Sequence, residues 1–177
     1  MVSLHPIIAE DIAAIAATPL PWERFAGKAV LITGAAGFLP AYLVETLLHL
    51  NDTRALNCRV LGLVRNLAKA RTRFAHHAAR SDLRLIEGDV ACPLTWPEPA
   101  HFIIHAASQA SPKHYGPDPV GTFNANVLGT HHLLEQARTW QSEGFLFVSS
   151  GEVYGRVAAE HIPTKESDYG WIEITES

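Results

Sequence analysis

The stretch Thr33-Gly34-Ala35-Ala36-Gly37-Phe38-Leu39-Pro40 decides the fold of this chain. It follows an apolar run at residues 29–33 and precedes residues 38–50, which are helical in length and apolar almost all round. A strand, a glycine-containing turn and a helix in this order predict a βα unit whose helix N-terminus binds the diphosphate of a dinucleotide. We expect Gly34 to permit the tight turn and Gly37 the close approach of backbone to phosphate.

Pro40 stands where the usual dinucleotide-binding pattern has its third glycine. Proline is tolerated in the first helical turn, since its missing N–H breaks no intrahelical bond there, so we expect the phosphate contact to survive. The competing phosphate loop GxxxxGK[ST] is absent from the sequence. The predicted cofactor contacts in this stretch are Gly34, Ala36, Gly37, Phe38 and Leu39.

Strands and helices alternate along the rest of the chain. Strands are expected at residues 59–64, 83–86, 102–105 and 145–148, and helices at residues 7–17, 67–77 and 119–140. This alternation predicts an α/β fold, a doubly wound Rossmann sheet of parallel strands in the order 3-2-1-4-5. We divide the chain into a helical leader, residues 1–26, and a dinucleotide-binding domain, residues 27–177.

Composition restricts the class of protein. The 177 residues are 47% hydrophobic and 18% charged with a net charge of -4, which suits a globular domain and provides no basic field for nucleic acid. The longest apolar runs are strand-sized, so we expect no membrane partner, and the first residues do not resemble a secretion signal. Cys58 and Cys92 lack metal-binding or disulfide spacing, which favours free thiols and a cytoplasmic location.

The end of the second strand bears on which nicotinamide cofactor binds. Val64-Arg65-Asn66 offers no carboxylate for an adenosine ribose, and Arg65 could pair with the 2′-phosphate of NADP. Equally, Arg65 could be a solvated cation while NAD binds through other groups, so both cofactors stay open. Asp89 and Val90 follow the third strand and are candidates for the adenine edge, or for an ordinary turn.

Four blocks match one enzyme family in order and spacing: residues 33–39, 105–108 (HAAS), 126–130 (NVLGT) and 148–155 (VSSGEVYG). With them, residues 27 to about 156 resemble the extended short-chain dehydrogenase/reductases, the NAD-dependent epimerase/dehydratase family acting on nucleotide sugars. Within that family the loop at residues 108–119 looks most like UDP-glucuronate decarboxylases.

The resemblance implies roles for several residues. Ala106, Ala107, Ser108, Asn126 and Ser149 would lie at the cofactor, Ser108 and Tyr115 at the substrate, and Ser150 and Glu152 at the reacting sugar. In the family, the hydroxyl that Ser150 matches bonds the sugar oxygen that becomes a ketone. Gly151-Glu152 replaces the Asp-Glu pair of dehydratases, which argues against 4,6-dehydration and fits a decarboxylase. The alternatives are a solvated turn at Tyr115 and a helix-entry carboxylate at Glu152.

The catalytic Tyr of the family, with a Lys four residues later, has no match here, because Tyr154 is followed by Ala158 and Tyr169 by Glu173. We therefore expect an amino-terminal portion, truncated before the sugar-binding domain and inactive alone. Its parent would be a decarboxylase or epimerase that transiently oxidises the sugar C4. The alternative is a non-catalytic dinucleotide-binding regulatory or scaffold module. A homodimer through residues 119–140 is expected, although covering the sheet also explains that apolar face.

Ten histidines raise the question of a metal site. His76-His77 and His131-His132 are adjacent pairs in expected helices. Neighbouring residues of an α-helix point to different faces, so neither pair should form one side of a site. We predict no metal site.

Overall fold

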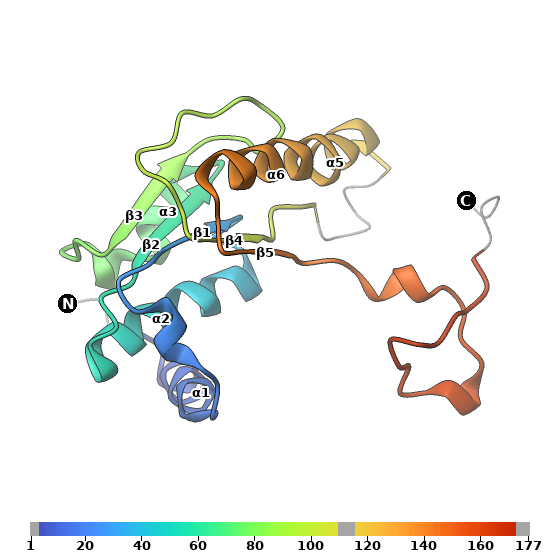
Figure 1. Ribbon diagram of the computed structural model, residues 1–177, viewed down its shortest axis with the longest axis horizontal. Helices are drawn as coiled ribbons and strands as arrows, with labels where there is room; N and C mark the ends of the chain where they lie inside the picture. The colour runs from blue at the N-terminus through green and yellow to red at the C-terminus, as the bar shows by residue number, and fades with distance from the viewer. Residues whose placement is uncertain (1–3, 110–115, 173–177) are drawn as a thin grey trace. The chain divides into compact units, whose positions relative to one another are not determined.

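The computed structural model describes residues 4–109 and 116–172, and the chain forms two compact units that divide between Phe147 and Val148. The first unit is built on a five-stranded parallel sheet in the order β3-β2-β1-β4-β5 (Figure 1). Its strands are β1 (Ala29–Thr33), β2 (Arg59–Val64), β3 (Leu83–Glu87), β4 (Phe102–His105) and β5 (Gly144–Phe147). The predicted doubly wound α/β fold and its strand order are confirmed.

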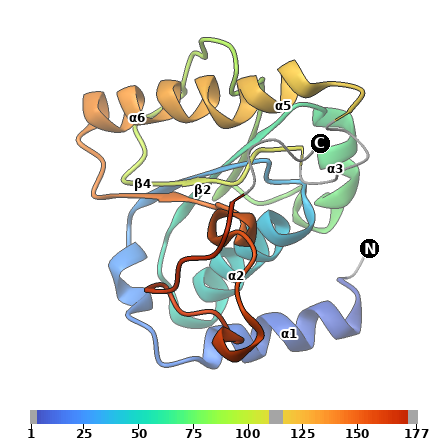
Figure 2. The ribbon, with the colours of Figure 1, turned by 90° about the vertical axis from the view of Figure 1, so that its right-hand side faces the viewer.

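Helices cover both faces of this sheet (Figure 2). They are α1 (Pro6–Ala17), η1 (Trp22–Phe25), α2 (Phe38–Arg54), α3 (Leu67–Arg73), η2 (Ala75–His77), α5 (Pro119–Asn126) and α6 (Leu128–Trp140). Val30 and Ile32 of β1 pack into the cluster that contains α2, whereas Leu31 packs into the cluster that contains α6. Burial on both faces explains why the strand is continuously apolar rather than alternating.

The helix expected near the N-terminus packs on α2. Ile12 and Ala16 of α1 are buried, and the hydroxyl of Tyr42 on α2 donates a hydrogen bond of 2.9 Å to Oδ2 of Asp11. The helix expected at residues 7–17 is confirmed, while the division of residues 1–26 as a leader stays a prediction. No helix in the described ranges combines the length and apolarity needed to cross a bilayer.

The long helix predicted for residues 119–140 is interrupted at Val127, which separates α5 from α6 with φ -99° and ψ -61°. The hydroxyl of Thr130 donates to the carbonyl of Asn126, one turn earlier. Backbone hydrogen bonds from Val127 to the Phe123 carbonyl (2.8 Å) and from His131 to the Val127 carbonyl (2.9 Å) still link the two helices.

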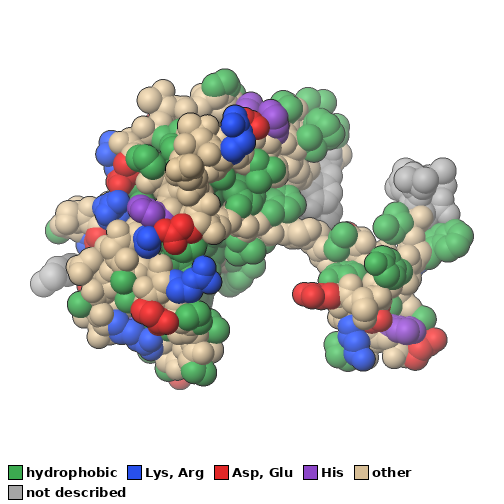
Figure 3. Space-filling model, in the orientation of Figure 1, with side chains coloured by type: hydrophobic (Ala, Val, Ile, Leu, Met, Phe, Trp, Pro, Cys, Tyr) green, Lys and Arg blue, Asp and Glu red, His purple; other side chains and the backbone are tan. Residues whose placement is uncertain are grey.

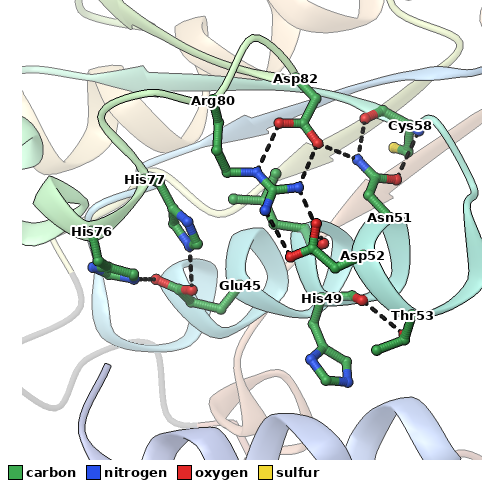
Figure 4. Close-up of polar contacts among 11 residues, drawn as sticks. Glu45, His49, Asn51, Asp52, Thr53, Cys58, His76, His77, Arg80 and Asp82 are labelled. Atoms are coloured by element: carbon green, nitrogen blue, oxygen red, sulfur yellow. Dashed lines mark hydrogen bonds and ion pairs between the residues drawn. The ribbon is translucent and has the colours of Figure 1, made fainter. Parts of the chain in front are cut away.

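The prediction that His76 and His77 point to different faces is wrong. The α-helix ends at Phe74 (φ -100°, ψ 26°), and the two histidines lie in the 3₁₀ turn η2 instead. Both rings reach the carboxylate of Glu45 on α2 (Figure 4). A tighter turn therefore brings together two side chains that an α-helix would separate.

A polar network joins the end of α2 to the starts of β2 and β3 (Figure 4). Asn51 donates 2.7 Å hydrogen bonds to the Cys58 carbonyl and to Oδ2 of Asp82, and its Oδ1 accepts from the Cys58 amide at 2.8 Å. Arg80 binds both Asp52 and Asp82 at 2.7 Å. Hydrogen bonds from Arg80 outweigh partial burial and lower the pKa of Asp82 to about 2.

The second unit contains two 3₁₀ turns, η3 (Gly151–Tyr154) and η4 (Ala159–His161). An antiparallel bridge pairs Arg156 with Trp171 through two hydrogen bonds of 2.9 Å. This backbone pairing closes residues 156–171 into a loop.

Candidate cofactor site

The turn between β1 and α2 has the conformation that its glycines were expected to provide. Gly34 adopts φ +66°, and a Cβ there would lie 3.0 Å from the Cα of Ala107 and 3.2 Å from the carbonyl oxygen of Ala106. Gly37 caps α2 and donates a 2.7 Å hydrogen bond to the Gly34 carbonyl. Ala36 between them is half-buried against the core. The turn is therefore tight and admits no side chain at Gly34.

The first turn of α2 leaves donors for a ligand. No side chain caps this helix within the described residues, and an α-helix supplies no acceptors for its first amides. Phe38 and Leu39 carry these amides and are 73% and 63% exposed. Pro40 is buried and is the third residue of the helix. Its missing N–H costs no helical hydrogen bond, because amides in the first turn have no acceptor within the helix. The positive end of the helix dipole and free N–H groups meet here, which suits an anion.

Thr33 and His105 join the ends of β1 and β4, where they are register partners. The hydroxyl oxygen of Thr33 accepts hydrogen bonds from the amides of Ala106 (3.1 Å) and Ala107 (3.0 Å), and lies 2.8 Å from Nδ1 of His105. Because both lone pairs of that oxygen are used, its proton is donated to Nδ1. His105 is therefore neutral with its proton on Nε2.

Burial agrees with the neutral form of His105. The side chain is fully buried and its Nε2 has no hydrogen-bond partner among the described residues. Burial lowers the pKa of His105, and the backbone of Ala125 opposes this shift only in part. The network fixes the backbone of residues 106–107 against Gly34 and so shapes the crevice between β1 and β4. This is the point where the strand order reverses, at which open α/β sheets bind ligands.

The end of β2 carries one cation and a capped helix. Arg65 is exposed, and Asn66 caps α3 by accepting from the Lys69 amide at 2.8 Å. Oε1 of Glu87, at the end of β3, lies 3.4 Å from the Leu67 amide. A carboxylate therefore lies beside the tip of β2, because Glu87 is the register partner of Val64.

Asp89 and Val90 form a turn that is tied to α6. Oδ1 of Asp89 accepts a 2.9 Å hydrogen bond from the Ala91 amide, while its Oδ2 has no partner in the described part of the chain. The carbonyl of Val90 lies 3.0 Å from Nδ1 of His132. The turn holds Val90 buried and leaves one oxygen of Asp89 for an external donor.

The segment after β4 leads from the crevice toward α5. Ser108 is exposed, and Nε2 of the Gln109 side chain donates a 2.9 Å hydrogen bond to Oδ2 of Asp118, which caps α5. Asn126 is half-buried at the end of α5. Tyr115, a predicted substrate contact, lies outside the described residues.

Ser149, Ser150 and Glu152 belong to the second unit. Ser150 caps η3 by accepting from the Glu152 amide at 3.2 Å, and all three residues are exposed. Their assignment to cofactor and catalysis stays a prediction.

Three features at or near the candidate cofactor site were not predicted. The Thr33–His105 pair gave no local signal, because the two residues are 72 positions apart. The position of Glu87 beside the end of β2 was not predicted, because the expected strand ended one residue earlier. Gly62 is the third: a Cβ there would lie 3.0 Å from Cβ of Ala35, and a glycine inside an apolar strand was the available sign of such close packing.

The sequence agrees with this geometry: a family model described as "NAD dependent epimerase/dehydratase family" matches residues 30–172. The chain belongs to this family. Its curated relatives include UDP-glucuronic acid decarboxylase 2 of Arabidopsis thaliana, which is 34% identical over 137 residues, covering 77% of this chain and 28% of the relative. GDP-6-deoxy-D-mannose reductase of Pseudomonas aeruginosa is 38% identical over 101 residues, covering 56% and 33%. The present chain thus spans about a third or less of the length of these two relatives.

A solved UDP-galactose 4-epimerase superposes with a TM-score of 0.61 at 28% identity, covering 80% of this chain and 44% of that one. Proteins similar to this epimerase-family chain are thus named for several modifications of nucleotide sugars.

Proposed function

We propose that this chain forms the dinucleotide-binding part of an NAD-dependent enzyme that modifies a nucleotide sugar. The observation that carries the proposal is the uncapped opening of α2 beside Gly34, at the point where the strand order reverses. Amides of Phe38 and Leu39 would bind the diphosphate, and residues 106–108 would line the nicotinamide side. Solved relatives that contain NAD, the enzyme WbmH and the dehydratase DesIV, share the fold.

NAD is preferred to NADP because of the charges at the ends of β2 and β3. A 2′-phosphate next to Arg65 would lie in the field of Glu87, whose carboxylate already accepts from the start of α3. A ribose hydroxyl, by contrast, can donate to a carboxylate. Arg65→Asp should leave NAD binding within about threefold by calorimetry, while a loss of NADP binding much stronger than that of NAD would assign the 2′-phosphate role to Arg65.

Gly37→Val tests the phosphate contact. A Cβ at Gly37 would lie 3.0 Å from the Gly34 carbonyl and 3.3 Å from Cδ of Pro40, so a branched side chain would disturb the turn and obstruct the anion. Calorimetry with NAD should show binding to the wild type and at least a tenfold loss in the variant. Unchanged affinity would contradict the assigned loop.

The proposed chemistry is decarboxylation of UDP-glucuronate, with epimerisation as the second candidate, as named for the relatives. A bound oxidised nicotinamide supplies a hydride acceptor for the sugar C4. Ser150 would donate a hydrogen bond to the C4 oxygen as it becomes a carbonyl, and Glu152 would orient the sugar or move a proton. Ser149 would bind the cofactor, Asn126 would brace the loops, and Ser108 and Tyr115 would contact the sugar.

The complete gene product, incubated with UDP-glucuronate and NAD, should release carbon dioxide and UDP-xylose. Activity on UDP-galactose with unchanged UDP-glucuronate would instead select the epimerase. A gene product that binds NAD and turns over neither sugar, and whose reading frame contains no Tyr with a Lys four residues later, would be the non-catalytic module.

We further propose a cytoplasmic homodimer. Apolar side chains lie exposed over α5 and α6 (Figure 3), and they include Val120, Phe123, Val127, Leu128 and Leu134. Such a face favours association with a second copy. Both cysteines are free, as a reducing compartment requires. Sedimentation equilibrium should give twice the chain mass, and Phe123→Glu should give the monomer.

A further inference from the structure

Glu45, His76 and His77 form a compact group, called here the Glu45 cluster, on the face of the sheet that α2 covers (Figure 4). Nε2 of His76 lies 2.9 Å from Oε1 of Glu45, and Nε2 of His77 lies 2.7 Å from Oε2. One ligand atom from each residue falls within 4.8 Å of the others. Both imidazoles thus present the same nitrogen to one carboxylate.

The cluster is largely buried, which separates it from an accidental surface grouping. The side chains of Glu45, His76 and His77 are 7%, 12% and 14% exposed. Glu45 lies on the buried side of α2 beside Val44 and Leu48, where an apolar residue would suit the packing. A carboxylate in such a place needs strong partners.

Within the described part of the chain, the Glu45 carboxylate has only His76 and His77 as partners. The nearby guanidinium of Arg80 is turned to Asp52 and Asp82 (Figure 4). Each oxygen of the Glu45 carboxylate therefore faces one imidazole nitrogen, which brings the three side chains together around one point.

We propose that Glu45, His76 and His77 bind a divalent transition metal of the zinc class. Two imidazole nitrogens and one carboxylate oxygen are donors that zinc prefers. Zinc–ligand bonds of about 2.0–2.2 Å place tetrahedral ligand atoms about 3.3 Å apart. Each nitrogen would move about 0.5 Å away from its Glu45 oxygen, and the two ring nitrogens, which lie within 4.8 Å of each other, would settle at the same spacing. The residual exposure of the histidines provides access for the ion from solvent.

The bound metal would act as a clamp. It would join α2, about two turns from its start, to η2, which buried Phe74 anchors to the core. The ligand set does not involve the crevice between β1 and β4, so this proposal does not depend on the dinucleotide assignment.

The test uses the whole 177-residue chain, treated with a chelator and titrated with zinc chloride by calorimetry. We expect saturation at one equivalent and a higher melting temperature with zinc. His76→Ala, His77→Ala and Glu45→Gln should each weaken the affinity at least tenfold. His131→Ala is the matched control, since His131 belongs to the other adjacent pair, whose rings are 6.0 Å apart, and this variant should bind as the wild type does.

A measurement on the wild type covers the case in which a variant fails to fold. Long-range ¹H–¹⁵N spectra resolve the two ring nitrogens of each histidine, and one equivalent of zinc should shift Nε2 of His76 and His77 selectively. Absence of saturable binding, shifts confined to other histidines, or equal affinity in the cluster variants would overturn the proposal.

Discussion

At Gly34 the backbone turns with φ +66°, and the atoms nearest to any added Cβ are backbone atoms of residues 106 and 107. A side chain there would be strained by the left-handed conformation and would also overlap a segment that the Thr33 hydroxyl holds in place. A side chain at this residue would thus be opposed by two effects, backbone strain and steric overlap. A second glycine that has only the strain can separate them.

Gly34→Ala should lower the free energy of unfolding by about 2–4 kcal/mol, the sum of left-handed strain and overpacking. Gly27 is the matched control, because it has φ +69° but nothing within 4 Å of an added Cβ. Gly27→Ala should therefore cost only about 1–2 kcal/mol in urea denaturation. Equal losses in the two variants would show that Ala106 and Ala107 exert no steric demand on Gly34.

His105 should make stability depend on pH. Burial lowers its pKa in the folded chain from the ordinary value of 6.5, so below about pH 6.5 the unfolded chain takes up a proton that the folded chain does not. The free energy of unfolding should then fall with decreasing pH, by at most about 1.4 kcal/mol per unit from this group.

His105→Asn keeps an acceptor for the Thr33 hydroxyl and removes the titration. Urea denaturation of both proteins between pH 7.5 and 5.5 should show a smaller loss of stability in the variant, whatever its absolute stability. Parallel pH profiles would contradict a depressed pKa at His105.

Among the elements, the connection from α2 to β2 depends on one side chain. Asn51 satisfies both the amide and the carbonyl of Cys58, a fully buried residue, and also bonds Asp82. Asn51→Ala should reduce the free energy of unfolding by about 1–3 kcal/mol for each buried group left without a partner. Thr53→Ala, on the same helix at an exposed site, should change it by less than about 0.5 kcal/mol. A similar effect of both changes in urea denaturation would remove the special role of Asn51.

The sequence predicted the elements of the sheet closely. All five strands lie within one residue of their expected bounds, because most are short apolar runs between polar or turn residues. The break at Val127 was not predicted, because no proline or glycine stands at that position to mark it. His76 and His77 were misjudged because η2 is a 3₁₀ turn, and the pairing of Thr33 with His105 exists only through the register of β1 with β4.

At the scale of the whole molecule, the strand order brings the turn after β1 and the segment after β4 to one crevice. Gly34 lies there against the backbone of residues 106–107, and the cofactor roles of these residues stay predictions. Ser149, Ser150 and Glu152 belong to the second unit, so their predicted roles rest on sequence and family membership. The residues proposed to bind the diphosphate all lie in the first unit, so cofactor binding can be tested through that unit's residues alone.

The most direct test removes one amide at the start of α2. Proline is well suited to the first helical position, and Gly37 before it has φ -70° and ψ 173°, a conformation that precedes proline readily. Phe38→Pro therefore deletes the N–H with little change to the helix, while Phe38→Ala deletes the side chain and keeps the N–H. In calorimetric titrations with NAD, Phe38→Pro should bind about 10–100-fold more weakly than Phe38→Ala, the loss expected for a hydrogen bond to a charged group. Equal affinities of the two variants would contradict a diphosphate held by the amides of α2.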